Sequence, residues 1–308
     1  MSSGFALSLI TTLMWGVLPV FLKRVLSNLD PVTITWVRLL FASVTVGSYY
    51  AWSGKWPAAS RFSRGNIGLL AGVAAAMAAN YWLFLAGLDL VAPPVAQLTI
   101  QSGPLFLAIG GWYFFAERIG KRQWTGFSVM LGGFWLFYSG KLANPQVVAA
   151  SVSEGLGIFL VILAALAWAA YALLQKRLAS QFPASFILLA GYSGAGILLG
   201  PGSSPGHAVG LDSKQAWYLL FCCVNTVVAY GCFAEAVRRW ESPRVSAVLA
   251  LTPLVTFVAS IAEAWVISGH IPQELMVSPV QWLGASFVVA GSMVAALNTR
   301  RPLNKSQV

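Results

Sequence analysis

Residues 123–133 read QWTGFSVMLGG and residues 281–291 read QWLGASFVVAG, so one Gln-Trp-x-Gly pattern appears twice, 158 positions apart. Two earlier blocks also recur, in the same order along the chain. One returns after 149 residues, in the pairs Tyr81/Tyr230, Phe84/Phe233, Pro94/Pro243 and Pro104/Pro253. The other returns after 153 residues, in the pairs Leu13/Leu166, Trp15/Trp168, Lys23/Lys176 and Arg24/Arg177. Such an ordered duplication predicts two related halves, a common plan of membrane transporters.

The composition indicates a membrane protein. Of 308 residues, 58% are hydrophobic and 9% are charged, whereas a soluble domain has about 25% charged residues. Because a helix needs about 20 apolar residues to cross the hydrocarbon core, we predict ten membrane-spanning helices, at residues 4–24, 31–52, 66–87, 93–115, 122–140, 156–176, 184–201, 214–236, 244–266 and 279–298. The predicted fold class is an all-α integral membrane protein, with ten transmembrane helices as two inverted five-helix repeats around a central cavity. The first repeat takes residues 1–145 and the second takes residues 146–308.

The basic residues of the loops predict the orientation, because short loops rich in Lys and Arg stay in the cytoplasm. With the N-terminus inside, fourteen Lys and Arg residues are cytoplasmic and four are not, namely Lys23, Arg24, Lys141 and Lys214. Both termini are therefore expected in the cytoplasm, and five helices per repeat make the second repeat enter the membrane upside down. The net charge of +10 follows from this topology, and its scatter over short loops predicts no nucleic-acid partner. The first helix belongs to the duplication, so we expect it to remain in the mature protein.

Motifs of membrane enzymes are missing from the sequence. It contains no His-Glu-x-x-His, no Cys-x-x-Cys and no phosphate-binding Gly-Lys-Ser/Thr pattern. We therefore predict that the chain is not an enzyme and needs neither a cofactor nor a metal. Cys222, Cys223 and Cys232 all fall in the eighth predicted span and are interpreted as small packing residues.

Three ionisable residues inside predicted spans are candidates for a functional role, because charge in the membrane is costly. Glu235 and Glu263 lie near span ends, where they are expected to reach the interface or to pair with Arg neighbours. Arg38 lies deeper, and it either locks helices together through backbone carbonyls or attracts a substrate carboxylate. No acidic residue or His falls near the midplane, where proton-coupled carriers keep their relay, so a uniporter is favoured over a proton antiporter.

Polar and aromatic side chains near mid-depth mark the candidate binding site. Trp15 and Trp168 lie at an unusual depth for Trp and either line a cavity or pack as bulky core residues. Gln97 and Gln101 share one helix face, where two amides need protein or water rather than lipid. The predicted substrate-binding residues are Trp15, Asn80, Tyr81, Phe84, Gln97, Gln101, Trp168, Tyr171, Tyr230, Phe233 and Ser246.

Prolines and glycines recur at positions that affect helix shape and packing. The candidate hinges, which alternatively bend a static bundle, are Pro94, Pro104, Pro243 and Pro253. The small-xxx-small pairs are Gly68/Gly72 and Gly196/Gly200. We expect these glycines to pack within the chain, which is accordingly predicted to be a monomer.

These features together resemble the drug/metabolite transporter superfamily, and within it the ten-helix EamA-type exporters. The matching features are Trp-containing first and sixth helices that end in Lys-Arg, the RLLFA stretch at residues 38–42, and the two segments that begin QW. The likeness covers essentially the whole chain. The second half departs from the first at one of these positions. Glu117 follows Pro104 by thirteen residues in the first half, whereas Val266 stands thirteen residues after Pro253 in the second half.

The resemblance implies an alternating-access carrier with a central cavity, which moves amino acids or small metabolites out of bacteria across the inner membrane. The aromatic residues suit an apolar or aromatic side chain, and the amides and Ser246 suit amino and carboxyl groups. The YddG-like exporters of aromatic amino acids are therefore the group that the chain is expected to resemble. Two alternatives stay open: multidrug or quaternary-ammonium efflux, proton-coupled or not, because aromatic rings bind cations, and a channel. The expected partners are a small-molecule substrate and the lipid bilayer.

Overall fold

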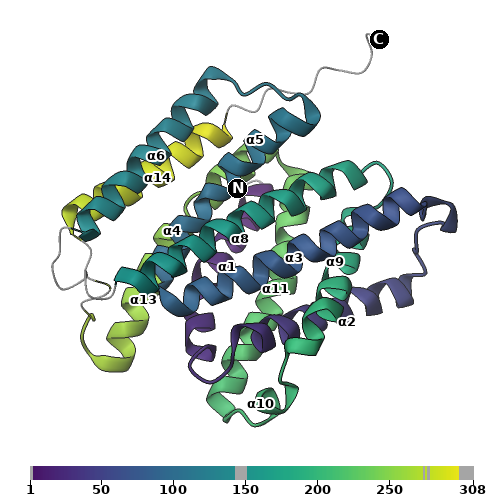
Figure 1. Cartoon of the computed structure of the whole chain (residues 1–308), viewed down its shortest axis with the longest axis horizontal. Coiled ribbons are helices and arrows are strands. Elements are labelled where there is room, and N and C mark those ends of the chain that lie inside the picture. Colours follow the sequence, from purple (N-terminus) through teal and green to yellow (C-terminus); the bar gives the residue numbers. More distant parts are fainter. Residues whose placement is uncertain (1–2, 143–150, 273–274, 276–277, 298–308) are drawn as a thin grey trace.

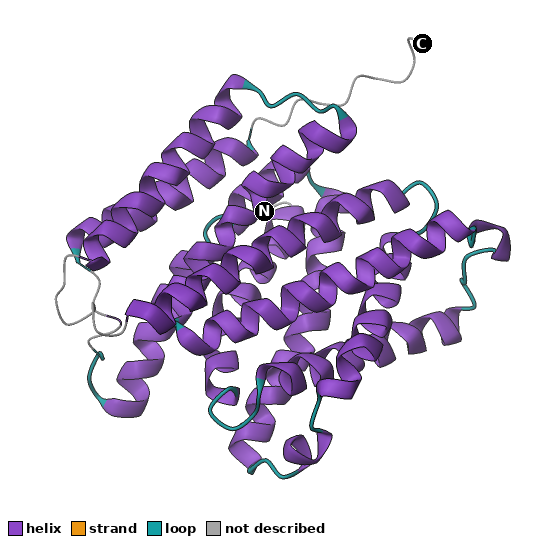
Figure 2. Cartoon of the chain, viewed as in Figure 1, coloured by secondary structure: helices purple, strands orange, loops and turns teal. Residues whose placement is uncertain are grey.

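The computed structural model describes residues 3–142, 151–272, 275 and 278–297, which form helices and loops with no strand among them (Figure 2). The long helices are α1 (Ser3–Val25), α2 (Pro31–Ser53), α3 (Arg64–Leu90), α6 (Lys121–Leu142), α8 (Ser151–Leu178), α9 (Ala184–Leu199), α11 (Ser213–Arg239) and α14 (Pro279–Ala296) (Figure 1). The shorter segments are α4 (Pro93–Thr99), α5 (Gly103–Phe115), α10 (Pro205–Val209), α12 (Ser242–Leu249) and α13 (Thr252–Ser268), with 3₁₀ turns at Ala59–Arg61, Ile100–Ser102 and Gly200–Gly202. The predicted boundary between the halves, at residues 145 and 146, lies outside the described residues.

Eight segments of the described chain are long and apolar enough to cross a membrane, and each overlaps one of the predicted spans. The other two predicted spans are helical but do not meet that standard. The span predicted at 93–115 is divided into α4 and α5, and each part is too short alone. The span predicted at 122–140 is α6, which is less apolar because it holds glycines, tryptophans, hydroxyl groups and Gln123.

Residues at the helix starts explain why the Gln of the repeated segment recurs. The Gln281 side chain accepts a hydrogen bond from the Ser278 backbone N–H at 2.9 Å, and the Ser278 hydroxyl accepts one from the Gln281 N–H, which makes a capping box at the start of α14. In the first half Gln123 accepts from the Gly120 N–H at 2.9 Å at the start of α6. Both glutamines therefore satisfy backbone donors that a helix start leaves free.

The fourth and ninth predicted spans are each broken near the middle. In the first half a 3₁₀ turn at Ile100–Ser102 separates α4 from α5, and in the second half α12 ends at Leu249 and α13 begins at Thr252. The four repeated prolines each occupy the second residue of one of these segments: Pro94, Pro104, Pro243 and Pro253. A proline is tolerated there because the first backbone N–H groups of a helix have no partner within it.

The helices α6 and α14, which carry the repeated QW segments, lie side by side at one edge of the molecule (Figure 1). Their backbones touch at two glycine contacts. A Cβ atom at Gly126 would lie 2.6 Å from the carbonyl oxygen of Gly291, and one at Gly133 would lie 2.7 Å from that of Gly284. Residue numbers rise along one helix as they fall along the other, so the pair is antiparallel. Small residues give this close approach in membrane proteins.

Three other close helix pairs, α1–α11, α3–α8 and α2–α9, are antiparallel as well. The Asn225 amide of α11 donates to the Met14 carbonyl of α1 at 2.6 Å, and Phe21 stacks at a tilt on Phe221, 4.2 Å between centroids. Between α3 and α8, a Cβ at Gly87 would lie 2.7 Å from the Gly157 carbonyl, while further along Gly72 meets Leu174. Between α2 and α9, hydrogen bonds join Ser43 to Ser193 and Tyr50 to Ser185. The helices of one half thus pack mainly against helices of the other half.

The expectation that both small-xxx-small pairs pack within the chain is wrong for Gly68, which is exposed and where an added Cβ would have no neighbour within 4 Å. Helix α9 instead packs on α3 through Gly191 and Gly194, where a Cβ at Gly194 would lie 2.5 Å from that of Ala74. Gly196 lies two residues further on, about 200° around the helix from Gly194, and it is buried although an added Cβ there would have no neighbour within 4 Å.

Candidate functional site

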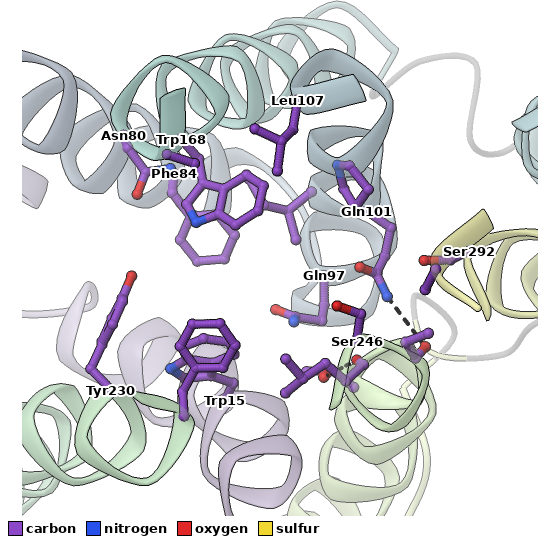
Figure 3. A pocket seen from close by; sticks show the side chains of 18 of the residues that line it. Trp15, Asn80, Phe84, Gln97, Gln101, Leu107, Trp168, Tyr230, Ser246 and Ser292 are labelled. Carbon is purple, nitrogen blue, oxygen red and sulfur yellow. Dashed lines mark hydrogen bonds between the residues drawn. The ribbon is translucent and has the colours of Figure 1, made fainter. Parts of the chain in front are cut away.

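A cavity of about 560 Å³ lies among the helices at the level of the two breaks (Figure 3). Its walls come from α1, α2, α3, α8 and α11, from the broken helices, and from α6 and α14. At one end the lining residues Leu22, Arg38 and Thr226 are buried. At the other end the lining residues Glu117 and Lys176 have half-exposed side chains. The cavity therefore opens beside α5 and α8 and is closed between α1, α2 and α11.

Aromatic side chains from the two halves face each other across the cavity (Figure 3). On one wall Trp15 packs edge-on against Tyr230, with 5.2 Å between centroids, and lies 5.6 Å from Phe233. On the opposite wall are Trp168 and Phe84, the counterparts of Trp15 and Phe233 in the duplication. The two walls are thus built from equivalent residues of the two halves.

Amide and hydroxyl groups occupy another side of the cavity, where Figure 3 draws Gln97, Gln101, Ser246 and Ser292. The Gln101 amide nitrogen donates to the Ala250 carbonyl at 3.2 Å. Positions 101 and 250 are 149 residues apart, so this bond joins equivalent points of the two helix breaks. A carbonyl freed by a broken helix needs such a partner inside a membrane protein.

The Asn80 side chain links α3 to α8 through its amide nitrogen and leaves its carbonyl oxygen available to a molecule in the cavity. Its amide nitrogen donates to the Ala164 carbonyl of α8 at 2.8 Å, and its side chain lines the cavity. In the same way, the amide nitrogen of Gln101 is bonded to backbone. Each amide therefore offers a carbonyl oxygen as a hydrogen-bond acceptor to a molecule in the cavity.

Arg38 brings a positive charge to the closed end of the cavity. The residue is 4% exposed, and its Nε donates to the Thr226 hydroxyl at 3.1 Å. Its guanidinium carbon lies 5.1 Å from the centre of the Tyr81 ring, within the range of a cation–π interaction. Among the described residues no carboxylate forms an ion pair with Arg38.

Two ion pairs join the halves, one at each end of the cavity. Arg24 at the end of α1 pairs with Glu263 of α13, and Lys176 at the end of α8 pairs with Glu117, which follows α5. Both link the first helix of one half to the fourth helix of the other, although the two glutamates do not align in the duplication. Glu235 pairs with its helix neighbours Arg238 and Arg239, as expected for a residue near a helix end.

Nearly all the predicted binding residues line this one cavity. The set comprises Trp15, Asn80, Tyr81, Phe84, Gln97, Gln101, Trp168, Tyr230, Phe233 and Ser246. Tyr171 is the exception, since it is buried in a core cluster with Tyr81 and Tyr192. In that turn of α8 the cavity is lined by Ala172 instead, because position 172 lies four residues after Trp168 on the same helix face. Among the predicted hinges, Pro104 lines the cavity, Pro94 and Pro253 are buried elsewhere, and the side chain of Pro243 is not described.

Several polar lining residues were missed. Thr226 precedes Tyr230 by four residues and shares its helix face, so the spacing held a usable signal. Gln123 begins the first QW segment and Ser292 directly follows the second, and both line the cavity because α6 and α14 flank it. Glu117 and Lys176 are brought to it only by the contact between α5 and α8, which sequence spacing does not give.

The chain matches the EamA-like transporter family over residues 2–139 and 155–297. An Escherichia coli K12 protein, "Uncharacterized inner membrane transporter YhbE", is 32% identical over 300 residues, which cover 96% of this chain and 92% of that protein. A second protein of the same strain, "Probable amino-acid metabolite efflux pump", is 24% identical over 306 residues, covering 96% and 95% of the two chains.

A protein of known crystal structure has the same fold. The two structures agree with a TM-score of 0.62, covering 97% of this chain and 99% of the other, at 16% sequence identity. At that identity the likeness concerns the fold alone.

Proposed function

Because the chain belongs to the EamA-like transporter family of the drug/metabolite transporter superfamily, we propose that it is a bacterial inner-membrane carrier that exports amino acids, aromatic or large and neutral, and related metabolites. The observation that carries this proposal is the cavity of about 560 Å³, with aromatic walls and one side of amides and hydroxyls. Ligand sites commonly have about 300–1,000 Å³ and this mixture of apolar walls and few polar groups. The relatives named as an inner membrane transporter and as a probable amino-acid efflux pump support the location and the substrate class.

The proposed architecture is ten spanning helices in two inverted five-helix repeats, divided near residue 145. The antiparallel contacts α6–α14, α3–α8, α1–α11 and α2–α9 support it, because each joins helices of opposite halves in a reciprocal pattern. The bond from Gln101 to the Ala250 carbonyl supports it further, since it crosses between equivalent positions. The excess of Lys and Arg in the loops on the side of the termini supports a cytoplasmic location of both termini.

We propose alternating access, with the fourth and ninth helices hinged at their breaks beside Pro104 and Pro253. With cytoplasmic termini, the open end of the cavity faces the cytoplasm, where an exporter loads its substrate. The Arg24–Glu263 pair lies beyond the closed end and holds α1 against α13 there. Opening toward the other side requires this pair to part.

The proposed transport runs down the substrate gradient. Among the described lining residues the one carboxylate is Glu117, which is paired with Lys176 at the open end. A proton relay needs a titratable group between the two openings of the cavity. This placement counts against proton-coupled multidrug or quaternary-ammonium efflux, and the buried Arg38 repels a cationic substrate. The closed end counts against a channel, which needs a continuous path.

Uptake of a panel of labelled amino acids into proteoliposomes tests the proposal. Saturable uptake of an aromatic or large neutral amino acid is expected, and Trp168→Ala and Gln101→Ala should weaken it. Trp135→Ala serves as the matched control, because this Trp is 70% exposed on α6 and is not part of the cavity lining. Equal uptake by empty and protein-containing vesicles across the panel would refute the proposal. If a proton gradient accelerated export and Glu263→Gln abolished that effect, the uniport mechanism would be wrong.

A further inference from the structure

Arg38 has more hydrogen-bonding capacity than its surroundings use. A guanidinium group has five N–H donors, and among the described residues one of them is engaged, the Nε that donates to Thr226. The Thr226 hydroxyl donates in turn to the Cys222 carbonyl at 2.8 Å, so it is fixed in place and orients the guanidinium. The remaining donors of Arg38 belong to a side chain that lines the cavity.

Tyr81 supplies a second unused polar group at the same place. The residue is 7% exposed and lines the cavity, and its hydroxyl lies beside the hydroxyls of Tyr192 and Tyr230 but makes no hydrogen bond of good geometry within the described part of the chain. Its ring lies under the Arg38 guanidinium. A buried hydroxyl without a partner costs about 1–3 kcal/mol, so this group favours a bound molecule that accepts a hydrogen bond.

The charges around the cavity leave Arg38 uncompensated. The charged residues among its described lining are Arg38, Glu117 and Lys176. Glu117 and Lys176 pair with each other at the open end, which leaves one net positive charge at the closed end. Isolated charge at this depth is costly, and it is usually retained where a ligand or a partner group neutralises it.

We propose that Arg38 and the Tyr81 hydroxyl form a carboxylate subsite at the closed end of the cavity, and that the transported molecule carries a carboxylate there. The inference rests on the proposed function and goes further, because it states which charged group of the substrate, a carboxylate, binds at which end of the cavity. Arginine suits this role because its planar donors match the two oxygens of a carboxylate. For the amino group of an amino acid, the cavity offers the carbonyl oxygens of Asn80 and Gln101, which lie on different sides of it and whose amide nitrogens are bonded to backbone (Figure 3).

Calorimetric titration of the purified protein with three related probes tests the subsite. L-Phenylalanine has both polar groups, 3-phenylpropionate lacks the amine, and phenethylamine lacks the carboxylate. In the wild type both carboxylates are expected to bind at least about tenfold more tightly than phenethylamine, as for a charged hydrogen bond. Arg38→Gln should raise the Kd of both carboxylates at least about tenfold, whereas the Kd of the cation phenethylamine should stay the same or fall, because a repelling charge is removed. Lys55→Gln is the control, because it removes a positive charge in the loop after α2, away from the cavity. It should leave the Kd of all three probes unchanged.

Two milder variants keep the test decisive if Arg38→Gln does not fold. Arg38→Lys retains the charge but not the planar donors, and Tyr81→Phe retains the ring under the guanidinium but not the hydroxyl. Each should weaken the carboxylates about two- to tenfold and spare phenethylamine. The proposal is overturned if the wild type binds phenethylamine as tightly as 3-phenylpropionate, or if the Arg38 and Tyr81 variants weaken all three probes equally, as helix locking alone would do.

Flux measurements separate this proposal from the proposed function. If the protein transports amino acids in proteoliposomes but Arg38→Gln keeps the wild-type preference for carboxylates, the subsite proposal is overturned and the carrier proposal stands. Selective carboxylate binding without flux would support the subsite and refute the carrier.

Discussion

Substitution of Gly133 by alanine should separate α6 from α14. The new Cβ would lie 2.6 Å from the Val288 nitrogen and 2.7 Å from the Gly284 carbonyl oxygen, whereas ordinary contact begins near 3.4 Å. The helices must therefore move apart by about 0.8 Å (3.4 − 2.6), and a gap of about 0.5–1 Å loses a quarter to a half of the dispersion energy at each contact. Overpacking of this kind costs about 1–3 kcal/mol.

Gly132 gives a matched control in the same turn of the same helix. A Cβ there has no neighbour within 4 Å, so Gly132→Ala adds a methyl group without a clash. Both variants gain the same helix propensity, about 1 kcal/mol, and their difference therefore isolates the packing cost. Unfolding by SDS in mixed micelles, followed by circular dichroism, gives the two apparent free energies.

We expect Gly133→Ala to unfold with an apparent free energy about 1–3 kcal/mol below that of Gly132→Ala. Equal values for the two variants would contradict the close glycine packing of α6 on α14. They would also remove one support for the proposed relation between the halves.

Three further predictions concern the ends of the helices. Glu263→Gln should raise labelling of the cavity from the closed side about two- to fivefold, because the variant loses an ion pair worth about 0.5–1 kcal/mol. The labelling is measured with a membrane-impermeant thiol reagent on a single-cysteine variant. Unchanged labelling would contradict the proposed role of the Arg24–Glu263 pair. Glu117→Gln, at the end that is already open, should not raise labelling from the closed side. Asp30 caps α2. Partial burial raises the pKa of its carboxyl group, but the hydrogen bonds from Thr33 outweigh this effect and lower the pKa below its ordinary value of 3.8. The stabilisation by the ionised carboxylate is therefore present above pH 3.8 and is lost as the pH falls through the lowered pKa. Asp30→Asn should keep the cap and flatten the fall in thermal stability below about pH 4, and an unchanged acid limb would count against this pKa shift.

The duplication and the hydropathy pattern predicted most of the helices, because apolar length is the main requirement for a membrane helix. The break inside residues 93–115 was harder to predict, since Pro104 indicated a bend but not its form. The 3₁₀ turn there is stabilised by tertiary contacts such as the bond from Gln101 to Ala250, which join distant parts of the chain.

The residues around the cavity were predicted where depth and helix face were sufficient guides. Trp15, Trp168 and the two glutamines are polar or amphipathic groups at mid-depth, and all four line the cavity. Tyr171 does not, because a shift of one residue around α8 moves a side chain by about 100° and helical spacing alone does not resolve it. The partners of charged groups, such as Arg24 with Glu263, depend on contacts between the halves and have no local signal.

Countertransport tests the central claim most directly, namely that one cavity serves the two faces of the membrane in turn. Proteoliposomes are preloaded with unlabelled L-phenylalanine, and uptake of labelled L-phenylalanine is followed over time. The account predicts uptake that saturates with concentration and transiently exceeds equilibrium in preloaded vesicles. Uptake that rises linearly with concentration and does not respond to preloading would contradict it.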